Sequence, residues 1–167
     1  MLAILKPMTA PEIYVRPAQE TDAWTLSAIH IAAIKALPAT FYTRKELLAW
    51  RNYLDKPDNS SIFKYLKLDT IKVATENEII TGFASFTGNE LISLYVHPHY
   101  QGRGFGRILV ENFCSEAFEQ GFHNVITTAS LYAEGFYLRL GFMPIKRVPH
   151  YLGSGLVVPV TEMKKEF

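Results

Sequence analysis

The stretch ELISLYVHPHYQGRGFG, residues 90–106, decides the fold of this 167-residue chain. Residues 90–96 are mostly apolar, β-branched or aromatic, which predicts a strand that is at least half buried. Pro98 lacks a backbone donor and favours an extended conformation at the residue before it, so we expect the chain to turn across residues 97–100. Helical periodicity begins near Gly104. A strand, a glycine-rich loop and a helix N-terminus are therefore expected in direct succession.

The helix that begins near Gly104 is expected to be amphipathic. Its apolar face consists of Phe105, Ile108, Leu109, Phe113 and Ala117, and its polar face consists of Arg107, Glu111, Ser115 and Glu119. Such spacing is typical of a helix that packs one side against a sheet. Gly121 is expected to end the helix, because glycine tolerates the left-handed conformation of a C-cap.

The loop at residues 101–106 has the chemistry of a phosphate site. The first N–H groups of a helix have no internal partner and carry the positive end of its dipole. Glycines let phosphate oxygens approach the backbone, and Arg103 and Arg107 add positive charge, so a phosphate or pyrophosphate is the expected ligand. A tight turn whose glycines serve only steric needs accounts for the same residues, and this stretch alone does not separate the two interpretations.

Two downstream segments help to decide between a phosphate site and a purely steric turn. They are TTASLYAEGFYLRLGF at residues 127–142, which contains Ser130, Tyr137 and Gly141-Phe142, and VPVTEMKKEF from Val158. Together with the spacing Gln101-x-x-Gly104-x-Gly106, they resemble, in order, the signatures of the GNAT N-acetyltransferase superfamily. The resemblance spans most of residues 13–165. It implies an α+β (α/β) fold with a splayed central sheet, mixed but mostly antiparallel, flanked by helices.

The resemblance also implies acetyl-CoA as the cosubstrate and indicates where it binds. The pyrophosphate is expected at Gln101, Gly102, Arg103, Gly104, Phe105, Gly106 and Arg107. A bulge near Leu94, Tyr95 and Val96 is expected to splay this strand from the next, to free main-chain groups for the pantetheine arm, and to offer an N–H to the thioester carbonyl. Ser130 stands where the superfamily often has Asn, and it can hydrogen-bond the same arm with fewer groups.

Tyr137 matches the superfamily position whose phenol protonates the leaving thiolate. A phenol stays protonated at neutral pH because its reference pKa is about 10, so it can deliver its proton when the thiolate forms. Packing of Phe136 and Tyr137 as an aromatic pair is the structural alternative.

The group that accepts the amine's proton is open. Glu90 lies eleven residues before Gln101, a spacing at which some members of the superfamily carry a catalytic glutamate. A solvated charge at a strand end is the alternative, and His30, His97 and His150 are other candidates. Four residues are expected to line the acceptor pocket unless they serve only the core: Trp24, His30, Tyr42 and Trp50.

Composition limits the remaining classes of protein. Hydrophobic residues make up 49% of the chain and charged residues 20%, a globular mixture with a formal net charge of +1. No basic face for nucleic acid, no membrane span and no metal-ligand cluster is expected. With a single cysteine, Cys114, the chain is expected to be cytoplasmic and to use that thiol in packing.

Residues 1–12 are expected to form a tail and residues 13–167 one domain, as a monomer or homodimer. Further helices are expected at residues 21–38, 43–50, 57–68 and 133–140, and further strands at 13–16, 71–75, 79–87, 125–129, 143–147 and 156–163. A loop holding His150, Tyr151, Gly153 and Gly155 is expected between the last two strands.

These expectations lead to one functional hypothesis and one rival. The hypothesis is an acetyl-CoA-dependent N-acetyltransferase in which a primary amine of a small molecule or peptide attacks the thioester directly in a ternary complex. The rival is a regulatory module that binds acyl-CoA without turnover. A Rossmann-type nucleotide enzyme is excluded because no early strand carries Gly-x-Gly-x-x-Gly.

Overall fold

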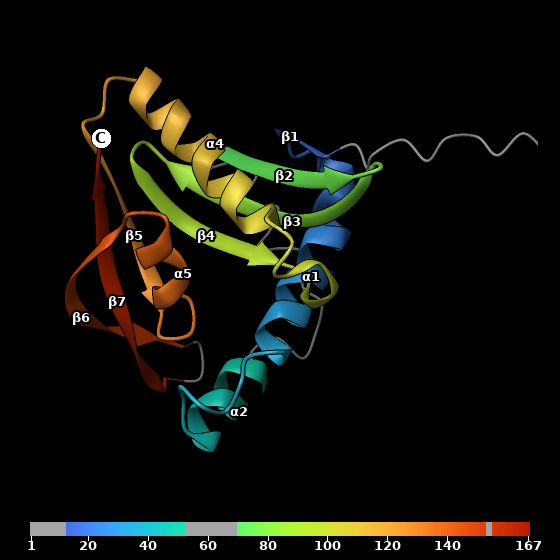
Figure 1. Cartoon of the computed structure of the whole chain (residues 1–167). Helices are drawn as coiled ribbons and strands as arrows, with labels where there is room; N and C mark the ends of the chain where they lie inside the picture. Colours follow the sequence, from blue (N-terminus) through green and yellow to red (C-terminus); the bar gives the residue numbers. More distant parts are fainter. Residues whose placement is uncertain (1–12, 53–69, 153–154) are drawn as a thin grey trace, which may run out of the picture.

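The computed structural model describes residues 13–52, 70–152 and 155–167. They form a seven-stranded sheet with helices on both faces (Figure 1). The expected tail at residues 1–12, the expected helix at residues 57–68 and Gly153 lie outside the described residues.

The strands are β1 (Ile13–Pro17), β2 (Thr70–Glu76), β3 (Ile79–Thr87), β4 (Glu90–Val96), β5 (Asn124–Ser130), β6 (Met143–Tyr151) and β7 (Val157–Glu166). The helices are α1 (Ala23–Lys35), α2 (Arg44–Asn52), α4 (Phe105–Glu119) and α5 (Glu134–Arg139), with short 3-10 turns at Glu20–Asp22 and Pro98–Tyr100. The strand order is β1-β2-β3-β4-β5-β7-β6, and only β4 and β5 pair in parallel. The expected mixed, mostly antiparallel sheet flanked by helices is confirmed.

Local sequence signals account for the ends of these elements. Thr43 and Glu46 form the expected capping box at α2: the Thr43 N–H donates to Glu46 Oε2 at 2.7 Å and the Glu46 N–H donates to Thr43 Oγ1 at 3.3 Å. Gly121 follows α4 with a φ of 88°, and the N–H of Phe122 reaches back to the Ala117 carbonyl at 3.1 Å. Both expected helix boundaries are therefore confirmed.

The core lies in two layers, one on each side of the sheet. On one face, α4 and α5 cover a cluster that contains Phe105, Phe113 and Phe142. On the other face, α1 packs its Leu26 and Ile29 against β2 and β3, and α2 packs beside the C-terminal end of α1. Figure 1 shows α4 and α5 in front of the sheet, α1 behind it and α2 below, beyond the end of α1.

The sheet opens between β4 and β5. The two strands pair only at Glu90 with Ile126 and at Leu91 with Thr127, and they separate after that. The splayed sheet that the sequence predicts is thus present. The bulge lies earlier than expected, at Ile92 and not at residues 94–96. Ser93 pairs with Ser85 of β3 and Leu91 pairs with the next residue, Phe86, so Ile92 is the extra residue in β4.

The end of β6 and the position of Cys114 can also be compared with the sequence-based expectations. His150 and Tyr151 belong to β6 and not to a loop, because β6 continues to pair with β7 as far as Tyr151 and Val157. Cys114 is buried on α4, and burial raises the pKa of its thiol, so the expected role in packing is confirmed. Within the described ranges, no helix is both long enough and apolar enough to cross a bilayer.

Candidate active site

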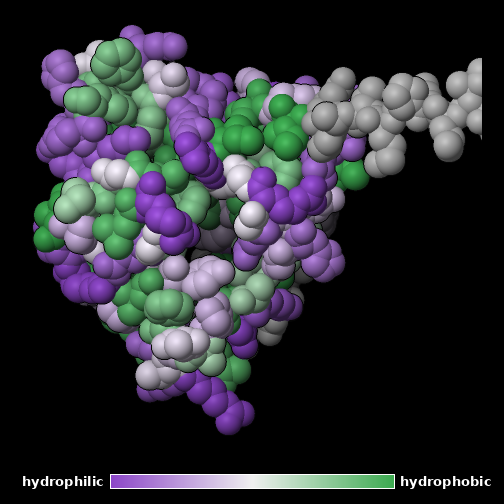
Figure 2. Space-filling model, in the orientation of Figure 1, coloured by the Kyte–Doolittle hydropathy of each residue, from purple (hydrophilic) through white to green (hydrophobic). Residues whose placement is uncertain are grey.

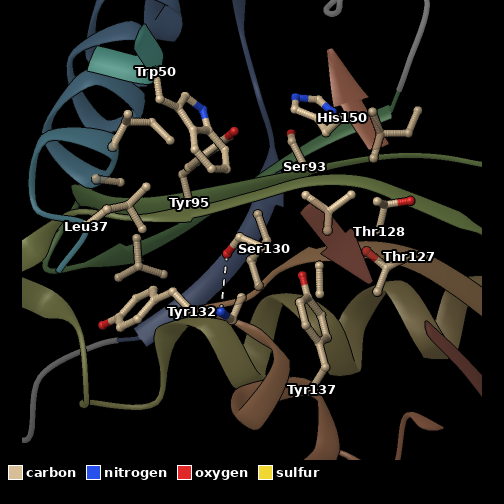
Figure 3. A pocket seen from close by; sticks show the side chains of 18 of the residues that line it. Leu37, Trp50, Ser93, Tyr95, Thr127, Thr128, Ser130, Tyr132, Tyr137 and His150 are labelled. Carbon is tan, nitrogen blue, oxygen red and sulfur yellow. Dashed lines mark hydrogen bonds between the residues drawn. The ribbon is translucent and has the colours of Figure 1, made fainter. Parts of the chain in front are cut away.

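A cavity of about 240 Å³ lies where β4 and β5 diverge. Its walls come from both faces of the sheet. The described lining residues are Ala33 and Ile34 of α1, Leu37 just after it, Trp50 of α2, residues 92–96 of β4, Gln101, residues 127–130 of β5, Tyr132, Ala133, Tyr137, His150 and Val160. In Figure 3, Trp50, Tyr95 and His150 lie on one side of the strands, and Tyr137 reaches toward Thr127 from the other side.

A larger groove of about 770 Å³ lies between the N-terminus of α4 and α5. Figure 2 shows a hollow near the middle of the face that carries these helices. Cavity and groove share five lining residues: Leu94, Val96, Gln101, Tyr132 and Ala133. The two spaces therefore meet at the gap in the sheet, so that a long ligand in the groove can reach the cavity.

The glycine loop forms one wall of the groove. The first helical bond of α4 runs from the Ile108 N–H to the Gly104 carbonyl at 3.0 Å, which leaves the N–H groups of residues 105–107 without a partner inside the helix. They are the donors that a phosphate at a helix N-terminus requires. Of the residues expected at the pyrophosphate, all except Arg103 line the groove.

The glycines serve different purposes. Gly104 has a φ of 93°, which a side chain rarely tolerates, but a Cβ placed on it would meet nothing within 4 Å. A Cβ on Gly106 would lie 3.3 Å from Cζ of Phe136 and 3.6 Å from Cγ2 of Val96. Gly104 is thus needed for the backbone conformation, and Gly106 keeps the space between α4, α5 and β4 free.

Arg103 differs from its expected role. Its guanidinium pairs with Glu76 at the end of β2 and lies 5.2 Å from the ring centroid of Tyr100 and 5.5 Å from that of Phe105. It therefore points to the β2–β3 turn and does not line the groove. Arg107 does line it, with its guanidinium paired to Glu111 at 2.7 Å.

The comparisons with known proteins agree with this geometry. Residues 67–144 match the model of the acetyltransferase (GNAT) domain. A GCN5-related N-acetyltransferase from Rhodopseudomonas palustris is 29% identical and superposes with a TM-score of 0.85 over 97% of this chain and 99% of that chain. The chain is thus similar to GNAT acetyltransferases in sequence over residues 67–144 and in fold over nearly its whole length.

Two further proteins show the range of similarity. An L-amino acid N-acyltransferase of Escherichia coli is 32% identical over 94 residues, covering 47% of this chain and 53% of the relative. The chain spans about half the length, or less, of the curated relatives that it matches. An acetyltransferase from Salmonella typhimurium, solved with acetyl-CoA, shares the fold at 24% identity and a TM-score of 0.67, covering 93% of this chain and 94% of that chain.

Tyr137 lines the cavity, and its neighbour Phe136 lines the groove. Its side chain is 4% exposed, and burial raises the pKa of its hydroxyl above the usual value. Its ring packs edge to face on Phe136 and Phe142, at 5.1 and 5.3 Å between centroids. The residue combines both roles weighed from the sequence, because the ring packs in the core while the residue lines the cavity.

Ser130 and residues 94–96 all line the cavity. The Ser130 hydroxyl accepts the Ala133 N–H at 3.2 Å and so supports the turn into α5, while Ser130 also lines the cavity. Leu94 and Val96 pack toward α4, and Tyr95 packs toward α1. The side-chain amide of Gln101 donates to the Val96 carbonyl at 3.0 Å and holds the end of β4 against the loop.

The candidate proton acceptors lie on different elements of the fold. Glu90 is exposed at the start of β4, where the strands are still paired, and it is not among the residues that line the cavity. His97 lies in the turn before the glycine loop, and His30 is covered by Tyr95 at 4.3 Å between ring centroids. His150 is the candidate that lines the cavity.

Of the four aromatic residues expected to line an acceptor pocket, Trp50 is the one that lines the cavity. Trp24 is 65% exposed and lies away from the cavity. Trp50 lines it directly, whereas Tyr42 is buried behind Trp50, at 5.3 Å between ring centroids. His30 and Tyr42 therefore support lining residues. No cluster of His, Cys, Asp or Glu that could hold a metal ion occurs among the described residues.

Proposed function

We propose that the protein is an acetyl-CoA-dependent N-acetyltransferase that transfers the acetyl group to a primary amine by direct attack in a ternary complex. One observation carries the proposal: the groove on the α4–α5 face meets, in the gap between β4 and β5, the cavity that extends to the α1–α2 face and that Tyr137 lines. Two substrates that enter from opposite faces of the sheet can meet there without passing each other.

The groove offers matching groups along the length of acetyl-CoA. The N–H groups of residues 105–107 and the charge of Arg107 suit the pyrophosphate. Beyond Leu91, β4 has no strand beside it on the β5 side, so the main chain of residues 94–96 can pair with the amides of the pantetheine arm. A backbone N–H there is the proposed donor to the thioester carbonyl, and the Ser130 hydroxyl is a further donor to the arm.

Tyr137 is the proposed general acid. As the new nitrogen–carbon bond forms and the carbon–sulfur bond breaks, the Tyr137 hydroxyl donates its proton to the leaving sulfur. Burial raises the pKa of this hydroxyl, which keeps the phenol protonated until a strong acceptor forms beside it. The tyrosinate that results recovers its proton from solvent after the products leave.

His150 is the proposed acceptor of the amine's proton. It lines the cavity on the α1–α2 side, and an imidazole is the side chain most often used for this task near neutral pH. Glu90, expected from its spacing to Gln101, remains the second candidate, acting through water because it lies at the paired end of β4.

Replacement of Tyr137 by Phe tests the proposal. The variant keeps the packed ring and loses only the hydroxyl, so kcat should fall about 100-fold to 10,000-fold, the usual cost of losing a positioned acid. The affinity for CoA should stay close to that of the parent, because a thioester sulfur accepts hydrogen bonds weakly in the ground state. Thiol release with a panel of primary amines and calorimetry with CoA measure the two quantities.

Tyr14→Phe, on the exposed strand β1, is the matched control for loss of a tyrosine hydroxyl. If Tyr137→Phe turns over like Tyr14→Phe, Tyr137 is a packing residue only. If the parent binds acetyl-CoA but releases no thiol with any amine, the protein is the regulatory acyl-CoA-binding module that rivals the enzyme.

A further inference from the structure

The acceptor side of the cavity is the side formed by α1 and α2, and its described lining residues carry no formal charge. Among the described residues that line the cavity, none is Asp, Glu, Lys or Arg. The side chains on the α1–α2 side are apolar or aromatic: Ala33, Ile34, Leu37, Trp50, Tyr95 and His150. The other polar groups of the lining are hydroxyls, the side-chain amide of Gln101 and main-chain atoms. The described wall can therefore bind a neutral group but offers no carboxylate, ammonium or guanidinium partner.

The aromatic part of this wall is held in place from behind. Trp50 and His150 lie 6.0 Å apart between ring centroids, with planes tilted by 34°. Tyr42 packs edge to face against Trp50 at 5.3 Å, and its own hydroxyl accepts the Leu131 N–H at 2.8 Å and donates to the Pro159 carbonyl at 3.3 Å. These bonds tie the segment before α2 to β5 and β7, which fixes the position of the Trp50 ring.

Tyr95 forms the second half of the wall and is supported in the same way. His30 covers one side of its ring at 4.3 Å and Phe83 packs beside it at 5.5 Å between centroids. Burial lowers the pKa of His30 to about 4, so its imidazole is neutral near pH 7 and adds no charge behind the wall. Aromatic faces therefore approach the cavity from α2, β4 and β6.

The lining disfavours three common kinds of amine acceptor. A polyamine or the lysine of a basic peptide brings additional positive charges, and no lining carboxylate is described that would compensate their loss of water. Cation–π contact with Trp50 offsets only part of that cost, about 2 kcal/mol when the contact is dry. A free amino acid brings a carboxylate, for which no lining Arg or Lys is described.

We propose that the acceptor is a primary amine on a short chain that carries one neutral aromatic ring, without a carboxylate or a second cationic group. The inference rests on the proposed N-acetyltransferase function. The ring packs on Trp50 and Tyr95, where aromatic contacts contribute about 0.5–1.5 kcal/mol beyond the burial of apolar area. The amine points toward the gap beside Tyr137. The apolar wall also disfavours the ammonium form, which helps to supply the neutral amine that the attack requires.

Initial rates with matched amines test the proposal in the intact protein at saturating acetyl-CoA. The probes are 2-phenylethylamine, n-butylamine, putrescine, an N-acetylated lysine amide, L-phenylalanine and L-phenylalanine amide. We expect kcat/KM for 2-phenylethylamine to exceed that for putrescine, the lysine amide and L-phenylalanine by at least about tenfold, the factor that corresponds to 1.4 kcal/mol. L-phenylalanine amide should be a better acceptor than L-phenylalanine, because it keeps the ring and the amine but lacks the carboxylate charge.

Variants at Trp50 show whether the wall carries this preference. Trp50→Leu should raise KM for 2-phenylethylamine about tenfold, with little change in KM for n-butylamine, and Trp50→Phe should restore most of the affinity. Calorimetry with CoA confirms that each variant is folded, since Trp50 does not line the groove.

The outcomes distinguish a wrong acceptor class from a wrong enzyme function. Preferred turnover of putrescine, the lysine amide or L-phenylalanine would overturn the acceptor class while leaving the enzyme function intact. An equal rise in KM for both amines in Trp50→Leu would also overturn it. Binding of acetyl-CoA without turnover of any probe would instead refute the proposed function on which the inference rests.

Discussion

At the scale of single residues, position in the splayed sheet matters more than spacing along the chain. Glu90 has the spacing to Gln101 of a catalytic glutamate, but it lies where β4 and β5 are still paired. His150 is distant in sequence from the glycine loop and yet lines the cavity, because β6 runs beside β7 at the outer edge of the sheet. The cavity therefore favours His150 as the proton acceptor.

His150→Gln and Glu90→Gln form a matched pair of variants. Loss of a positioned base should lower kcat/KM of His150→Gln about 100-fold at neutral pH, while Glu90→Gln should stay near the parent. Added imidazole should restore part of the activity of His150→Ala, since His150 is open to solvent. The reverse ranking in steady-state rates would assign the base to Glu90 and make His150 a wall residue only.

At the scale of elements, α1 carries a buried imidazole that links the fold to pH. His30 is covered by Tyr95, and burial lowers the pKa of its ring from 6.5 to about 4. The unfolded chain therefore binds a proton at this residue before the folded protein does. The contribution of the neutral imidazole to stability is complete above about pH 6.5 and is lost as the pH falls toward 4.

This linkage predicts a fall in the free energy of unfolding on the order of 3 kcal/mol between pH 6.5 and 4 from His30 alone. Urea unfolding of His30→Gln at the two pH values should show a smaller fall than the parent. His123→Gln, which removes an exposed imidazole, serves as the control and should retain the parent's fall. An identical pH dependence in His30→Gln would show that His30 is not buried in the neutral form.

At the scale of the whole molecule, few contacts close the gap between the two halves of the sheet. Strands β4 and β5 share only two residue pairs, and Tyr42 adds hydrogen bonds to Leu131 and Pro159 on the far side. A ligand that lies along β4 and against α5 contacts both halves and requires the folded arrangement of both. Its binding should therefore stabilise the whole fold.

Acetyl-CoA at about 100 times its Kd should add about 2.7 kcal/mol and raise Tm by about 5–10 °C for a chain of this size. Thermal scans with and without the ligand measure the shift. Gly106→Val should abolish it, because the new side chain would crowd Phe136 and Val96 at the wall of the groove. An equal shift in a folded Gly106→Val protein would place the ligand elsewhere.

The sequence by itself determined the order of the elements around the glycine loop, the helix caps and the resemblance to the superfamily. Pro98, Gly104, Gly121 and the Thr43–Glu46 box act over a few residues, so their effects can be read from neighbours in the chain. The proposed role of Tyr137 came instead from the resemblance of its segment to the superfamily pattern, and it stays a prediction.

Only the tertiary structure decided which distant residues meet. It placed the bulge at Ile92 and turned Arg103 toward Glu76. It also assigned the steric role in the loop to Gly106 and brought Trp50 and His150 together across 100 positions of sequence. Sheet register, long-range ion pairs and cavity walls depend on how separate elements pack, and local periodicity carries no information about that packing.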